Sequence, residues 1–138
     1  MVYGGLRFFD RAEIKNAMAY MRLAENPSDD SAFLRVVNVP ARGIGAKSIE
    51  NLVDFATTNG ISLFESMQYI RGAAAAKFAA FKEIIDTLRV AKDEMPLPAF
   101  VDFTVEKSGL KNMYEMDPNG SERIENLQEL TSAAQGFI

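Results

Sequence analysis

The sequence predicts an all-α fold, an irregular bundle of about seven to eight helices. Most of the chain repeats apolar residues at three- and four-residue intervals, as in Ile14, Ala17, Met18 and Met21. Capping residues precede several of these segments, and glycine, proline or asparagine ends them. The one exception is residues 2–9, a short aromatic and glycine-bearing stretch that we interpret as strand-like.

The first half of the chain divides into three predicted helices. Residues 10–25 form the first, with Asp10 and Glu13 as a capping box and Phe9 packed on Ile14 as a hydrophobic staple. Residues 28–38 form the second, which Pro40 ends. Residues 46–58 form the third, and the following Asn-Gly pair is a natural stop.

The second half follows the same logic. The run Ser62-Leu63-Phe64-Glu65 is a capping box that opens a short helix to residue 70. The remaining predicted helices cover residues 73–92, 99–107, 110–116 and 121 onward. Two prolines interrupt the chain before residue 99, and Ser121 is the expected cap of the last helix.

The length of 138 residues fits one α-helical domain, residues 1–138. Both ends look cut. The first residues resemble a strand without a sheet, and the last predicted helix runs into the apolar pair Phe137-Ile138. We therefore expect a piece of a longer protein.

The amino-acid composition limits the catalytic and metal-binding chemistry that this chain can perform. The chain has no cysteine and no histidine, so the commonest metal ligands and the commonest general base are missing. It has no P-loop, no signal-peptide layout and no apolar run of about 18 residues. We expect no catalytic residue, no metal, no cofactor and no membrane partner in this piece, and a cytoplasmic location.

Two recurrent features have ordinary structural explanations. The acidic pairs formed by Glu122, Glu125 and Glu129 at helical spacing are typical of a solvated helix face. The methionines are typical core filler; those in question are Met18, Met21, Met67 and Met113.

The most specific feature is a glycine loop between the second and third predicted helices. The net charge is −4, yet residues 31–49 contain no acidic side chain. Ile44 between two glycines should point inward, and the second glycine opens a helix whose free N–H groups suit a phosphate. An ordinary helix–helix turn is the alternative. We predict a helix-hairpin-helix-like contact to the DNA backbone, made by Arg42, Gly43, Ile44, Gly45, Ala46, Lys47 and Ser48.

A resemblance supports this interpretation. The segment Gly4-Gly5-Leu6-Arg7-Phe8-Phe9-Asp10-Arg11-Ala12-Glu13-Ile14-Lys15 resembles a signature of the UvrD/PcrA/Rep family of superfamily 1 DNA helicases. The similarity continues through Arg35-Val36-Val37-Asn38 and Arg42-Gly43-Ile44-Gly45, and resumes at Lys107-Ser108-Gly109-Leu110, Met113-Tyr114-Glu115 and Arg123-Ile124-Glu125-Asn126-Leu127.

The resemblance implies that the chain is the α-helical 2B subdomain, with residues 1–9 as the junction from motor domain 2A. It implies a duplex contact at Gly43, Ile44 and Gly45, and a parent enzyme that unwinds DNA from 3′ to 5′ with ATP and Mg²⁺ during repair or replication. ATP would bind in parts of the parent that this chain lacks. Val39 and Ala41 stand where the family often has threonines, so phosphate binding would depend more on backbone groups, Arg42 and Lys47. Asn16 replaces the usual Asp.

Two alternatives to this function remain. An acidic helical surface suits a protein-interaction module that docks a repair protein or another helicase protomer. A stand-alone helix-hairpin-helix protein is less consistent with the cut ends.

Overall fold

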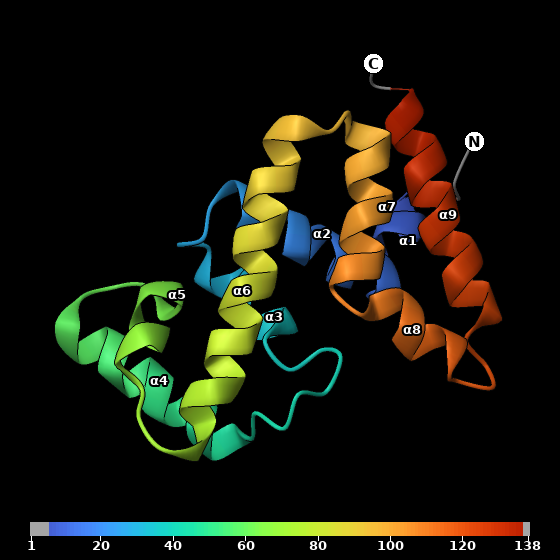
Figure 1. The fold of residues 1–138 in the computed structure, drawn as a ribbon. Helices are drawn as coiled ribbons and strands as arrows, with labels where there is room; N and C mark the ends of the chain where they lie inside the picture. Colours follow the sequence, from blue (N-terminus) through green and yellow to red (C-terminus); the bar gives the residue numbers. More distant parts are fainter. Residues whose placement is uncertain (1–5, 137–138) are drawn as a thin grey trace.

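The computed structural model describes residues 6–136, and every regular element in that range is helical (Figure 1). The all-α prediction is confirmed. The elements are α1 (Leu6–Asp10), α2 (Ala12–Glu25), α3 (Asp30–Val36), α4 (Ala46–Asn59), α5 (Leu63–Ser66), the 3₁₀ turn η2 (Met67–Tyr69), α6 (Ala73–Glu94), α7 (Leu97–Lys107), α8 (Leu110–Glu115) and α9 (Ser121–Gln135).

The long helix α6 separates two groups of helices (Figure 1). On one side α7 packs against α8 and α9, and α2 contacts both α7 and α9. On the other side α4 packs chiefly on α5, and the turn η2 joins them to α6. The glycine loop joins α3 to α4, and Lys77 of α6 contacts it at Gly43. None of the helices within residues 6–136 is long and apolar enough to cross a membrane.

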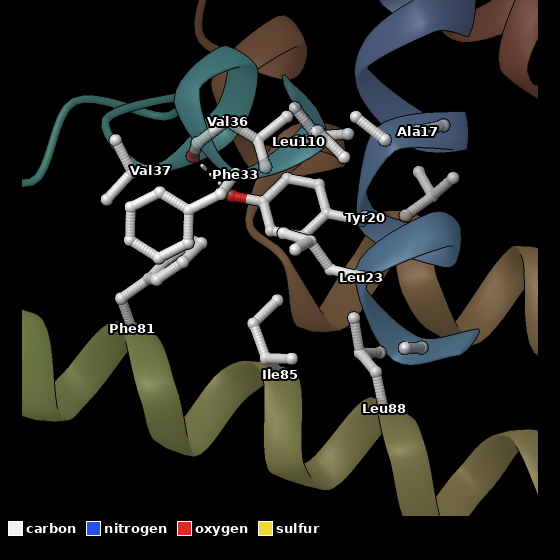
Figure 2. Packing of buried hydrophobic residues seen from close by; sticks show 14 of the residues in the cluster. Ala17, Tyr20, Leu23, Phe33, Val36, Val37, Phe81, Ile85, Leu88 and Leu110 are labelled. Carbon is white, nitrogen blue, oxygen red and sulfur yellow. Dashed lines mark hydrogen bonds between the residues drawn. The ribbon is translucent and has the colours of Figure 1, made fainter. Parts of the chain in front are cut away.

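The centre of the core is an aromatic cluster between α2, α3 and α6 (Figure 2). Tyr20, Phe33 and Phe81 are completely buried. The ring centroids of Phe33 and Phe81 lie 5.4 Å apart at 85°, an edge-to-face arrangement that aromatic pairs favour. Aliphatic side chains from α2 and α6, among them Leu23 and Ile85, extend this core.

Buried polar side chains of α2 tie it to distant helices. Glu13, only 4% exposed, accepts a hydrogen bond from the amide nitrogen of Asn126 at 2.7 Å. Asn16 accepts from Nε of Arg35 at 2.9 Å and donates to the hydroxyl of Tyr114 at 3.2 Å. Both of these buried side chains have hydrogen-bond partners, which offset part of the cost of burying them.

The strand-like interpretation is wrong for residues 6–9, which belong to α1, and residues 1–5 lie outside the described range. Phe8 is buried and meets Phe9 edge-on with ring centroids 5.1 Å apart. With no strand in residues 6–136 to pair with, the backbone satisfies its hydrogen bonds as a helical turn packed on α2.

Two predicted caps are also wrong. Asp10 ends α1, so Arg11 precedes α2 without a side-chain cap. Glu13 accepts the hydrogen bond from Asn126 instead of capping the helix. Gly120, not Ser121, precedes α9. A Cβ at Gly120 would lie 2.0 Å from the carbonyl oxygen of Tyr114, so close packing requires glycine there.

Other boundaries shift by small amounts. Ser62 accepts from the backbone N–H of Glu65 as predicted, and Gly60 adopts the left-handed conformation that ends α4. The helix predicted for residues 99–107 begins earlier, at Leu97, because Pro98 fits the first turn rather than preventing it. The four methionines interpreted as filler lie in or against the core, as expected.

Replacing the central ring tests this core. Phe81→Ala should lower the free energy of unfolding by about 3–5 kcal/mol, because it removes a fully buried aromatic side chain and leaves a cavity. Val90→Ala on the same helix is the matched control. Val90 is 61% exposed, so its loss should change stability by no more than about 0.5 kcal/mol. Urea denaturation measures both, and equal effects would contradict the assigned core.

Candidate functional site

The glycine loop, residues 37–45, joins α3 to α4. Its shape depends on one side chain that sequence reasoning did not single out, Asn38. The Asn38 side-chain oxygen accepts from the backbone N–H of Arg42 at 2.7 Å and of Ile44 at 3.2 Å. Ile44 is 1% exposed, so it points inward as predicted. These contacts hold the loop in one conformation.

The two glycines of the loop differ. Gly43 has a φ of 76°, which L side chains rarely adopt, and a Cβ there would lie 3.0 Å from Nζ of Lys77. Gly45 has extended backbone angles, φ −81° and ψ 173°, and nothing lies within 4 Å of where its Cβ would be. The fold therefore requires glycine at position 43, whereas Gly45 leaves open space in front of α4.

Arg42 is half-buried, and its guanidinium makes several hydrogen bonds within the chain. Its Nη1 donates to three backbone carbonyls of the same segment: those of Val36 at 3.2 Å, Val37 at 3.4 Å and Pro40 at 3.0 Å. A guanidinium is well suited to this task because its donors form a fixed planar fork. The side chain closes the loop on itself.

The other arm of Arg42 joins the loop to the rest of the molecule. Nη2 donates to the hydroxyl of Tyr20 at 2.6 Å and to the carbonyl of Ser108 at 3.0 Å. The guanidinium carbon lies 5.2 Å from the ring centroid of Phe81. One side chain thus connects the loop to α2, α6 and the α7–α8 junction.

Tyr20 completes this arrangement. Its hydroxyl donates to the carbonyls of Val36 and Val39 (Figure 2 shows the first of these partners). Burial raises the pKa of Tyr20 to about 12, and the nearby Arg42 cation opposes the rise only in part. Tyr20 is therefore neutral at physiological pH and serves as a hydrogen-bonding group.

The N-terminus of α4 lies next to Gly45 and carries no side-chain cap. Gly45 O accepts from the N–H of Ile49, which is ordinary helical bonding. Among residues 6–136, no protein acceptor is recorded for the N–H groups of Ala46, Lys47 and Ser48. Exposed N–H groups and the positive end of a helix dipole form a site that suits an anion.

Two lysines lie near this helix end. The Lys47 side chain is 80% exposed and lies 3.9 Å from Glu50, a surface pair of little energetic weight. Lys77, exposed on α6, donates from Nζ to the carbonyl of Gly43 at 3.0 Å. Sequence reasoning missed Lys77, because a contact between residues 34 positions apart leaves no local signal.

The seven predicted residues therefore divide into two groups. Arg42, Gly43 and Ile44 build the loop from the inside. The residues at the helix end are Gly45, Ala46, Lys47 and Ser48. Helices α3 and α4 do not form one of the extensive helix pairs, so the helix-hairpin-helix arrangement stays a prediction. No cluster of three His, Cys, Asp or Glu side chains that could hold a metal occurs within residues 6–136.

Comparison with known proteins identifies the class. The family model described as the UvrD-like helicase C-terminal domain matches residues 1–138. The chain belongs to this family, which confirms the resemblance seen in the sequence.

The individual relatives that the chain resembles are DNA helicases. DNA helicase II of Haemophilus influenzae is 42% identical over 99% of this chain, and DNA helicase II of Escherichia coli is 40% identical over 99%. The ATP-dependent DNA helicase PcrA of Bacillus subtilis is 34% identical over 99%. The chain spans about a fifth of the length of these relatives, 20% of the first two and 19% of the third.

The role of Arg42 in the fold can be tested by substitution. Arg42→Met should lower the free energy of unfolding by about 2–4 kcal/mol, because buried carbonyls lose a charged donor. Arg42→Lys should recover only part of this loss, since an ammonium lacks the planar fork. Lys47→Met is the control and should be neutral within about 0.5 kcal/mol. Chemical denaturation distinguishes them, and a neutral Arg42→Met would refute the assignment.

The buried Tyr20 hydroxyl predicts a loss of stability in alkali. Its folded pKa of about 12 exceeds the ordinary value of 10.0, so the folded state holds its proton more tightly. Stability is unaffected by this group below about pH 10 and falls by about 2 kcal/mol as the pH rises toward 12. Denaturation at several pH values should show this step in the native chain and not in Tyr20→Phe. Identical curves would contradict it.

Proposed function

We propose that this chain is the duplex-DNA-binding and regulatory 2B subdomain of an ATP-dependent 3′–5′ DNA helicase that acts in DNA repair or replication. The single observation that carries the proposal at the level of the site is the uncapped N-terminus of α4 behind the open position of Gly45. Membership of the UvrD-like family and the relatives named as DNA helicases support the parent activity.

The proposed contact is made by the backbone. The N–H groups of Ala46, Lys47 and Ser48 bind one phosphate of the duplex, and Gly45 allows the sugar-phosphate chain to approach closely. Lys47 and Lys77 add positive charge on either side. Arg42, Gly43 and Ile44 act indirectly, because they hold the loop against the core.

The contact should be weak and independent of sequence. A single helix end meets few phosphates, and contacts to phosphate carry no base information. A weak contact of this kind suits a subdomain that holds duplex DNA ahead of the fork. Motor domains elsewhere in the parent would hydrolyse ATP with Mg²⁺. We place the parent in the cytoplasm, with the rest of the helicase as the first partner of this chain.

A titration with a fluorescent DNA duplex at low salt tests the contact. Lys47→Glu should weaken binding about tenfold and lower the slope of log K against log salt by about one, because one phosphate contact is lost. Gly45→Val should weaken binding as well, through obstruction, since its extended backbone accepts a β-branched residue.

The matched control is Arg89→Glu, which makes the same change in net charge on the exposed surface of α6. It should retain the native affinity, and circular dichroism should show all variants folded. An equal loss of DNA affinity in Lys47→Glu and Arg89→Glu would show that net charge, and not the position of Lys47, causes the effect. No binding by the native chain would favour the protein-interaction module instead.

A further inference from the structure

A groove beside the C-terminal half of α4 takes part in none of the contacts described so far. It consists of two adjoining hollows that share Ile61. Leu34 of α3 and Val53 of α4 line the first hollow, and Phe55 and Tyr69 line the second. We call this surface the α3–α5 groove.

The groove exposes large apolar side chains to water. Leu34 is 48% exposed and Tyr69 is 50% exposed. The rings of Phe55 and Tyr69 are stacked, with centroids 5.3 Å apart and planes at 22°, so the pair presents a flat and rigid surface. Contiguous apolar surface of this kind is typical of sites that bind other molecules.

The charge of the groove is acidic. Asp30 and Glu65 line it, and no lysine or arginine does. The Asp30 carboxylate accepts from the N–H of Leu63 at 3.0 Å, which fixes its position, and neither carboxylate has an ion-pair partner within residues 6–136. These charges repel the phosphates of nucleic acid and attract a cation.

The position of the groove separates it from the proposed DNA contact. Gly45 and Ala46 begin α4, whereas Phe55 lies in its last turns. The part of α4 that lines the groove begins at Val53, about 10 Å along the helix axis from Ala46. A molecule in the groove would therefore leave the N-terminus of α4 open.

We propose that the α3–α5 groove docks a cationic amphipathic segment of a partner protein. Its apolar side chains cover Leu34, Ile61 and the Phe55–Tyr69 pair, and its lysines or arginines meet Asp30, Glu65 and the face of Tyr69. This proposal is independent of the DNA contact, because it rests on other residues and on the opposite charge.

A model peptide tests the chemistry. The probe is a peptide of about 14 residues that carries Leu and Lys at helical spacing, and its counterpart replaces every Lys with Glu. Titration of the isotope-labelled chain should shift amide resonances of α3, α4 and α5 with the Lys peptide and leave them in place with the Glu peptide.

Variants identify the groups responsible. Leu34→Ser and Tyr69→Ser should each weaken binding of the Lys peptide about tenfold through lost apolar contact, and Glu65→Lys should weaken it through repulsion. Asp30 is left unchanged because it holds Leu63. Val90→Ser, which alters an exposed apolar residue of α6, is the control and should bind as the native chain does.

Several results would overturn the proposal. These are equal binding of the two peptides, shifts spread over the whole surface, and unchanged affinity in both serine variants. A DNA duplex that displaces the peptide would assign the groove to nucleic acid. Groove shifts that grow with protein concentration alone would assign it to a second copy of the chain.

Discussion

The structure around the glycine loop depends on the half-buried guanidinium group of Arg42. Arg42 donates to carbonyls of the loop, to Tyr20 and to Ser108, and its guanidinium carbon lies over the Phe81 ring. Because these partners come from α2, α6 and the α7–α8 junction, this contact determines where the loop can lie.

The loop combines a rigid inner side with an open outer side. Asn38 and Ile44 hold the inner side, and Gly43 supplies a backbone conformation that other residues resist. Gly45 and Lys47 face outward and make few contacts within the chain. For the proposed phosphate contact, this division would limit the entropy lost on binding, because the loop is already ordered.

Helix α4 links two surfaces of opposite character. Its first turn combines free N–H groups with Lys47 and lies near Lys77, and its last turns border an apolar groove that carries Asp30 and Glu65. The net charge of −4 does not reveal these two surfaces, because it gives the sum of the charges and not their positions. The two proposals place DNA at one end of this helix and a cationic segment at the other.

The sequence by itself determined the helical fold, most helix positions and the inward direction of Ile44, because these depend on local periodicity and on residues such as Pro40. It misassigned residues 6–9, Asp10 and Ser121, because the packing of α1 on α2 and the close approach of Gly120 to the Tyr114 carbonyl decide these helix ends. Only the tertiary structure decided that Arg42 points inward and that Lys77 reaches the loop. Both depend on contacts between residues more than 20 positions apart, which no local pattern encodes.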